Sequence, residues 1–425
     1  MMKKIPLALI AAMLSTAIMA AGENIEDPKP KGDEITERIH AAALAWLDNY
    51  LKKNKPDELV PIAEAIADRL IAGGNLWAAG DPAFSDELNF RAGGLAGTRI
   101  WAQGQKLEKS DVFIVGQLAC NDKASRFFHP AFIGQAYGPF RNVLTVHIGS
   151  HNWPQVARVD EMTKKERWSQ GFYSIDTDSP EADSWEAVAV GQMSTLAVWW
   201  ALDVEIISAL SRKGKTAAVL GSIFAPDAEA FDDKIKGKFI LEEPKVEPIA
   251  AGKLAREYLA TCRRQIAAFL ETAQQLELRK AALRIADCQK RKAVIWTVME
   301  GHVHARGAIV PQELSQLLVY GSAWEWEAPP QGLHPGDTLL YFGYIKYPKE
   351  VVDVSLKAGA DAVVLVVDET PKDEKITGIR STWERWDGVV PIPNYPYKAA
   401  PSSAVVTTVQ WYSLMAEAQA LLRKK

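Results

Sequence analysis

LDNYLKKNKPDELVPIAEAIADRLIAGGNLW at residues 47–77 and IAAFLETAQQLELRKAALRIADCQKRKAVIW at residues 266–296 are two copies of one segment. The copies lie 219 positions apart and align without gaps, with eight of 31 positions identical, among them Trp77 and Trp296. In both copies a helical pattern leads into a short apolar strand. Self-similarity at a fixed offset indicates a repeated structural unit. The chain is therefore predicted to contain the same unit twice.

Apolar runs alternate with helical patterns after each copy. Runs such as DVFIVG at residues 111–116 are continuous, which is typical of buried parallel strands. An apolar helix is expected at the end of each unit, at residues 185–210 and 403–422. The pattern predicts an α/β fold of two tandem parallel-sheet sandwiches, each with three flavodoxin-type layers. Strands are expected at residues 75–79, 99–102, 111–116, 142–148, 293–298, 316–320, 337–343 and 361–367.

The first twenty residues have the order of a secretory signal peptide. Lys3 and Lys4 precede an apolar run that ends in small residues at positions 20–22. The run is shorter than a membrane span, so export to the periplasm or outside the cell is expected, with no stable span after removal of the signal. The apolar residues 195–210 include Asp203 and Glu205 and are predicted to form a buried helix. The expected divisions are a signal at 1–20, domain 1 at 34–223, a linker at 224–253 and domain 2 at 254–425.

Composition excludes several classes of protein. The 425 residues carry 48% hydrophobic and 24% charged side chains, which excludes a disordered chain. The formal charge is −4 and no basic stripe stands out, so no nucleic-acid partner is expected. The three cysteines, Cys120, Cys262 and Cys288, are widely spaced and form no metal-type pair. Neither a metal nor a cofactor is predicted.

Three segments resemble the sugar isomerase (SIS) domain family. They read GDPAFSDELNFRAGGL at residues 80–95, LEKSDVFIVGQLACNDKASR at 107–126 and HPGDTLLYFGYIKYPKEVVDVSLKAGADAVVLVV at 334–367. The arrangement is similar to that of the isomerase half of glucosamine-fructose-6-phosphate synthase. The resemblance implies tandem SIS-type α/β domains and a site for a sugar or sugar phosphate. The loops at residues 116–122 and 343–348 lack the serines and threonines of the family, so the copies are degenerate.

Candidate binding residues lie where strands end and helices begin. Loops at the carboxyl ends of parallel strands present free N–H groups to ligands. Lys346 could add a point charge, and four tryptophans in polar loops, Trp324, Trp326, Trp383 and Trp386, could stack on a sugar ring. The predicted ligand-binding residues are Gly80, Asp81, Ser85, Gln117, Asn121, Gly301, His302, Lys346, Ser402 and Ser403.

The segment Glu300-Gly301-His302-Val303-His304 is the densest polar cluster. Glu300, His302 and His304 would share a face if extended, and are the candidate catalytic acid/base residues. A polar turn without a ligand is the alternative interpretation.

The predicted function is binding of a carbohydrate derivative, a sugar or sugar phosphate, by an exported protein. One alternative is an active aldose–ketose isomerase, and another is a non-catalytic scaffold or interaction protein. The isomerase hypothesis requires an open pocket near Gly301 and Gly116 that is not filled by Phe84 and Tyr344. The oligomeric state is left open, with a homo-oligomer as one outcome.

Overall fold

The computed structural model describes residues 35–102, 105–118, 143–152, 171–181, 183–300, 310–314, 317–322 and 332–424. The first copy runs through helices α2 (Ile35–Lys52), α3 (Lys55–Glu58), α4 (Val60–Ile71), α5 (Pro82–Leu88) and α8 (Trp185–Arg212), and strands β1 (Leu76–Gly80), β2 (Arg99–Ile100), β3 (Val112–Gly116), β4 (Leu144–Gly149) and β5 (Phe172–Asp176). The second runs through helices α10 (Lys253–Glu271), α11 (Gln274–Lys290), α12 (Lys349–Lys357) and α13 (Ser403–Arg423), and strands β8 (Ile295–Met299), β9 (Leu317–Ser322), β10 (Thr338–Phe342), β11 (Asp361–Val366) and β12 (Ile376–Arg380).

Each copy builds a five-stranded parallel sheet with the same strand order. The first sheet is ordered β2-β1-β3-β4-β5 and the second β12-β11-β10-β8-β9. Counted within its own copy and from the other edge, the second sheet also has the order 2-1-3-4-5, the flavodoxin-like arrangement. The α/β fold with two tandem parallel sheets is therefore confirmed, although the sequence pattern does not predict the edge strands β5 and β12.

A tryptophan–aspartate contact recurs at the same place in both sheets. In the first, Asp111 accepts hydrogen bonds from the Asn75 backbone N–H (2.8 Å) and from the Trp77 indole (3.1 Å). In the second, Asp337 accepts from the Val294 backbone N–H (2.8 Å) and from the Trp296 indole (3.4 Å). Trp77 and Trp296, which are identical in the two copies, are thus buried and bind an aspartate at the amino end of the neighbouring strand. We call each tryptophan–aspartate contact a clamp. The same clamp in both sheets supports the duplication.

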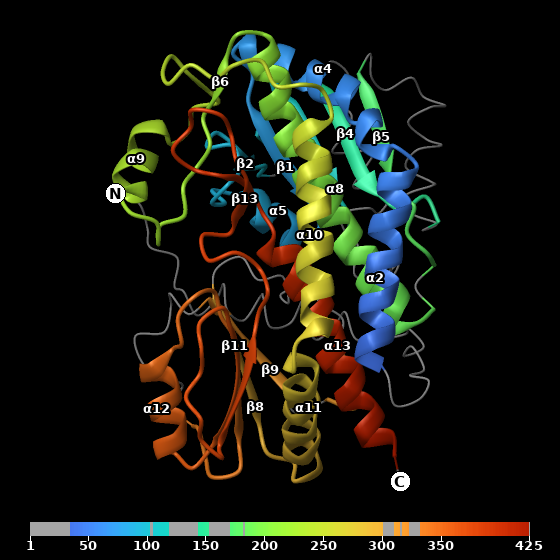
Figure 1. Ribbon diagram of the computed structural model, residues 1–425, viewed down its shortest axis with the longest axis vertical. Coiled ribbons are helices and arrows are strands. Elements are labelled where there is room, and N and C mark those ends of the chain that lie inside the picture. The colour runs from blue at the N-terminus through green and yellow to red at the C-terminus, as the bar shows by residue number, and fades with distance from the viewer. Residues whose placement is uncertain are drawn as a thin grey trace.

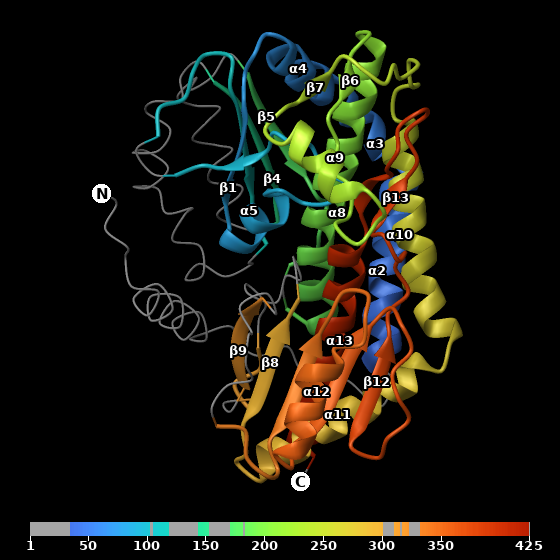
Figure 2. The same ribbon diagram turned by 90° about the vertical axis from the view of Figure 1, so that its left-hand side faces the viewer.

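Four long helices connect the two sheets. Figure 1 shows the sheets toward opposite ends of the long axis, with α2, α8, α10 and α13 running beside one another along it. Helix α10 of the second copy packs against α8 and α2 of the first, and α13 packs against α8 and α2 as well. Figure 2 shows α12 on the outer face of the second sheet. The largest core cluster includes residues from both copies, so one continuous interior joins them.

Helix α8 has no solvent-facing stripe. Its residues from Ala187 to Ser211 are all buried, as the apolar sequence predicts. Among the described residues it is the one helix long and apolar enough to cross a membrane, and its apolar window is wholly enclosed by the protein. Its place in the middle of the four-helix layer accounts for this composition.

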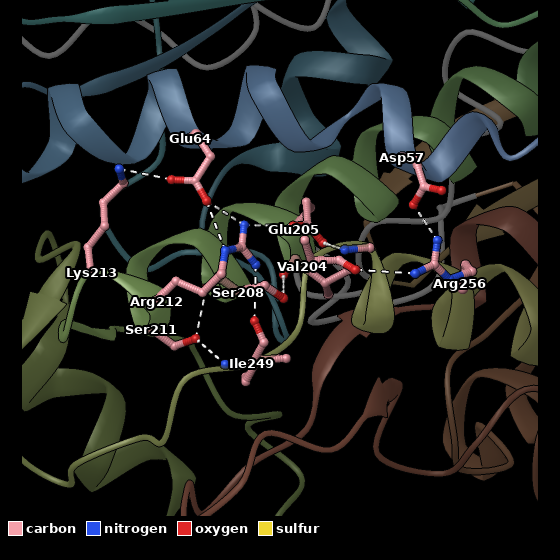
Figure 3. Close-up of polar contacts among 12 residues, drawn as sticks. Asp57, Glu64, Val204, Glu205, Ser208, Ser211, Arg212, Lys213, Ile249 and Arg256 are labelled. Carbon is pink, nitrogen blue, oxygen red and sulfur yellow. Dashed lines mark hydrogen bonds and ion pairs between the residues drawn. The ribbon is translucent and has the colours of Figure 1, made fainter.

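Polar side chains secure the end of α8 (Figure 3). Arg212 bridges Glu64 of α4 (2.6 Å) and Glu205 of α8 (3.0 Å). The other Glu205 oxygen accepts from the Gly252 N–H at 2.9 Å, which ties the start of α10 to α8. Burial raises the pKa of Glu205, and Arg212 opposes that shift. Glu205, one of the two acidic residues in the apolar run 195–210, therefore links α8 to the start of α10.

The five remaining elements are short. They are β6 (Thr216–Ala217), α9 (Ala228–Ile235), β7 (Ile240–Leu241), β13 (Gly388–Val390) and β14 (Ala399–Pro401). β6 pairs with β7, and β13 pairs with β14, both antiparallel.

Candidate functional site

The residues predicted at the first sheet are brought together at the start of α5. Gly80 ends β1 with φ +103°, and a Cβ there would lie 2.3 Å from the Gly116 carbonyl oxygen, so the close approach of β1 and β3 requires glycine. Asp81 caps α5 by accepting from the Ala83 N–H at 3.0 Å. The Ser85 hydroxyl donates to the Asp81 carbonyl at 3.2 Å. These polar groups are used within the turn itself.

An aromatic ring fills the space in front of Gly116. A Cβ on Gly116 would lie 2.4 Å from the ring of Phe84, so that buried ring rests directly on the backbone where β3 ends. Gln117 follows; it is buried, and its carbonyl accepts from the Thr195 hydroxyl of α8 at 3.0 Å. Asn121 lies outside the described residues. The isomerase hypothesis requires a pocket near Gly116 that Phe84 does not fill. Phe84 fills this space, which counts against that hypothesis.

Glu300 occupies in the second copy the place of Asp81 in the first. Its backbone N–H donates to the Phe342 carbonyl at 2.8 Å, as that of Asp81 does to Gly116. Its carboxylate accepts from the Tyr344 N–H (2.8 Å) and the Tyr341 hydroxyl (3.1 Å). Burial raises the pKa of Glu300, and these two donors oppose the shift. Gly301, His302 and His304 lie outside the described residues, and Lys346 is exposed.

A buried charged cluster joins the two copies near these loops. Arg91, in the loop after α5, is 2% exposed. Its guanidinium lies 2.5 Å from the Asp387 carboxylate and donates to the Tyr344 hydroxyl at 2.5 Å. It also donates to the Ser403 hydroxyl at 2.5 Å and to Glu87 at 3.3 Å. We call these five residues the Arg91 cluster.

Asp387 is the centre of the Arg91 cluster. One carboxylate oxygen accepts from the Ser403 N–H at 2.9 Å. The other accepts from the Ser403 hydroxyl at 3.0 Å and from the Tyr344 hydroxyl. Burial raises the pKa of Asp387, against the effect of Arg91. A protein carboxylate thus occupies the positive amino end of α13, the kind of position where a ligand anion could bind.

Burial alone would lower the pKa of Arg91, but Asp387, Tyr344 and Glu87 together raise it, so the guanidinium stays charged. Glu87 is also bound by the Trp200 indole at 3.0 Å. Strongly shifted pKa values occur at functional sites and also in ion-pair networks that stabilise a fold, so the Arg91 cluster is a candidate site.

Aromatic side chains surround the Arg91 cluster. Trp383 is buried and its ring lies 4.9 Å from that of Tyr344, so the prediction of Trp383 as an open ligand platform is wrong. Trp386 is 43% exposed, beside Asp387 in sequence. Trp324 and Trp326 lie outside the described residues. Trp386 is the exposed one of the two described candidates, and the Arg385 guanidinium lies over its ring, 5.5 Å from the centroid.

The structure places the predicted residues in two groups. Ser403 belongs to the Arg91 cluster, and Ser402 precedes it, fully buried. Gly80, Asp81, Ser85 and Gln117 gather at the first sheet. Sequence reasoning missed Glu87, Arg91 and Asp387. The Glu87–Arg91 spacing of four, inside the segment that carries the family resemblance, is the signal that could have found the first two.

No protein-family model and no curated protein sequence matches the chain. Among solved structures, the fold is similar to a protein from Clostridium difficile 630 provisionally named a phosphosugar isomerase, at 10% identity over 92% of this chain and 94% of that chain, TM-score 0.49. It is also similar to a provisionally named sugar-binding protein from Salmonella typhimurium LT2, at 10% identity over 92% of this chain and 100% of that one, TM-score 0.48.

A third similar structure is the C-terminal domain of glucosamine-fructose-6-phosphate aminotransferase from Francisella tularensis, at 11% identity over 86% of this chain and 95% of that chain, TM-score 0.43. The structural neighbours are thus phosphosugar isomerase and sugar-binding proteins, the group that the sequence motifs resemble.

Proposed function

We propose that this protein is an exported binder of a carbohydrate derivative and that the Arg91 cluster is its recognition site. The observation that carries the proposal is the burial of a guanidinium, two carboxylates and two hydroxyls, drawn from both copies, at the carboxyl edge of the second sheet. Burying such groups is costly unless they are paired and hydrogen-bonded to one another. Arginine, tyrosine and serine donors with a neighbouring exposed tryptophan suit a polar ring ligand.

The export part of the proposal rests on residues 1–20, whose charged start, apolar middle and small-residue end are typical of a cleaved signal. Outside the cytoplasm, sugars and their acids are more accessible than metabolic sugar phosphates.

An isomerase is less well supported. Such an enzyme needs an acid/base group open to the substrate. Glu300 instead holds the Tyr344 N–H and the Tyr341 hydroxyl, while Phe84 covers Gly116 and Tyr344 is buried. A scaffold without a ligand is the second candidate, favoured by the occupation of the α13 amino end by Asp387.

The test is a titration of residues 21–425 with a panel of sugars, sugar acids and sugar phosphates, read by thermal unfolding. A ligand at 100 times its Kd stabilises the protein by about 2.7 kcal/mol, a readily measured shift in Tm. Tyr344→Phe removes one hydroxyl from the Arg91 cluster and is expected to weaken binding about tenfold or more. The matched control is Tyr397→Phe, because the Tyr397 hydroxyl donates to the Pro226 carbonyl (3.2 Å), outside the Arg91 cluster. Absence of stabilisation by every compound would favour the scaffold.

A further inference from the structure

The donors around Asp387 form a receptor for a carboxylate. They are the Arg91 guanidinium, the Tyr344 hydroxyl, and the N–H and hydroxyl of Ser403, and they converge on two oxygens of one planar group. Three of these contacts are charge-assisted or involve the first N–H of α13, a helix of 21 residues. The neighbouring Ser402 hydroxyl is fully buried and has no hydrogen-bond partner among the described residues, which leaves one polar group unused at this helix end.

From this geometry we propose that the ligand carries a carboxylate, as in a sugar acid of the uronic type, and that this group takes the place of Asp387 at its donors. The inference rests on the proposed function and adds the chemical class of the ligand. Asp387 is then an internal competitor that holds the site closed while no ligand is present.

Charge explains why a carboxylate suits the site better than a phosphate ester. Glu87 is fully buried beside Arg91 and accepts from both Arg91 and Trp200, so among the described residues of the Arg91 cluster one positive charge faces two carboxylates. Exchange of Asp387 for a ligand carboxylate leaves the charge of the site unchanged. A phosphate dianion would add a further negative charge next to Glu87, and an uncompensated buried charge is strongly unfavourable.

The proposal requires Asp387 to move out of the Arg91 cluster when a ligand binds. It lies in a tight turn with φ +66°, a conformation that aspartate tolerates but glycine prefers. Trp386, one residue before it, is 43% exposed, so the turn reaches the surface. A sugar ring stacked on Trp386 would bring its carboxylate to the same turn.

The first experiment uses the wild-type protein and matched trios of one hexose: glucuronate, glucose and glucose 6-phosphate, then the galactose equivalents, by calorimetric titration. One uronate is expected to bind at least about tenfold more tightly than both its neutral and its phosphorylated relative. Equal or tighter binding of the neutral sugar or of the phosphate would overturn the inference while leaving the proposed function intact.

The second experiment uses acetate, the chemical equivalent of the aspartate side chain, as a probe. Asp387→Gly removes the competitor at a position whose backbone suits glycine, so acetate is expected to raise the Tm of this variant and not that of the wild type. Asp387→Asn is the matched control, because it removes the same charge but keeps the space filled. Adding Arg91→Met to Asp387→Gly is expected to abolish the acetate effect. An equal response of wild type, Asp387→Asn and Asp387→Gly, or none in any, would refute the receptor.

The two experiments separate the two claims. Acetate rescue of Asp387→Gly without binding of any sugar would support the carboxylate receptor and contradict the proposed function. Circular dichroism of each variant establishes that it is folded, and the wild-type titration does not depend on the variants.

Discussion

Arg91 is the residue through which the first copy reaches the second copy in the Arg91 cluster. From a loop of the first copy it reaches Tyr344, Asp387 and Ser403 of the second. A single side chain therefore neutralises a carboxylate and fixes the junction of the copies. Because the side chain is buried, water does not weaken these contacts.

Replacement of Arg91 by methionine is expected to destabilise the protein by about 3–5 kcal/mol, because it leaves Asp387 buried without its counter-charge. The free energy of unfolding in urea measures the effect. Arg385→Met is the control: Arg385 pairs with Asp368 at 3.1 Å on the surface, so its loss should cost about 1 kcal/mol or less. A similar cost for both variants would contradict the role given to Arg91.

His40 makes stability depend on pH. It is buried between helices, with its ring 4.9 Å from that of Phe269 and Nδ1 2.9 Å from the Thr36 carbonyl. Burial lowers its pKa from 6.5 to about 4. The folded state therefore resists protonation while the unfolded state accepts it below pH 6.5, so stability is lost as pH falls from about 6.5 to about 4.

The expected contribution of His40 is about 1.4 kcal/mol of stability lost per pH unit in that window. Urea unfolding of wild type and His40→Phe at pH 7, 6 and 5 measures it, since phenylalanine keeps the ring against Phe269 and cannot titrate. The difference in unfolding free energy between the two proteins should shift in favour of the variant by about 0.7 kcal/mol from pH 7 to 6 and by about 1.2 kcal/mol from pH 6 to 5, because pH 7 lies above the unfolded pKa of 6.5. A difference independent of pH would show that His40 does not titrate as described.

At the scale of elements, the duplicated strand pairs are held by equivalent contacts. Asp111 also accepts from the Glu108 N–H at 2.9 Å, and Asp337 from the His334 N–H at 2.9 Å. Burial would raise the pKa of Asp111, but its hydrogen bonds outweigh that effect and lower it. Each aspartate closes the turn before its strand and binds the neighbouring strand.

Asp111→Ala and Asp337→Ala are expected to cost similar amounts of stability, about 2–4 kcal/mol each, because several buried donors lose their acceptor in either variant. Since the two sites lie in different sheets, the double variant should show the sum to within about 0.5 kcal/mol. Chemical denaturation of the four proteins provides the values. A strongly non-additive double variant would indicate that the clamps are coupled.

Much of the element pattern can be predicted from the sequence, for a physical reason. Buried parallel strands such as β3 and β10 are continuous apolar runs, and the repeat places β1 and β8 in register within the chain. The edge strands carry a weaker signal: β12, ITGIR, alternates half-buried and buried residues and ends in an exposed arginine. The sequence carries almost no signal for the Arg91 cluster, because the side chains at positions 91, 344, 387 and 403 meet only through the tertiary fold.

At the scale of the whole molecule, the helices of each copy stabilise the other. Glu417 of α13 accepts from the Thr36 hydroxyl at 2.9 Å, at the start of α2. The Trp185 indole of α8 donates to Gln419 of α13 at 2.8 Å. These contacts cross between the copies within the apolar core, so each half alone would expose much of what it buries.

Expressed separately, residues 34–223 and 254–425 are each expected to aggregate or remain partly folded, because the faces of α2, α8, α10 and α13 lose their partners. Co-expression of the two pieces is expected to restore a soluble one-to-one complex. Size-exclusion chromatography and circular dichroism of the pieces alone and together test this. Two soluble, folded, non-associating halves would show that the copies are independent domains.

The sharing of α2 and α10 between the copies has an evolutionary consequence. A tandem duplication usually leaves each half free to be lost, replaced or moved into another gene. Here the contact between the copies is part of the protein interior, since α10 packs on α2 and α8 of the other half. Neither copy can be replaced without changes in the other. A substitution where α10 packs on α2 and α8 should therefore be accompanied by a compensating substitution in the other copy.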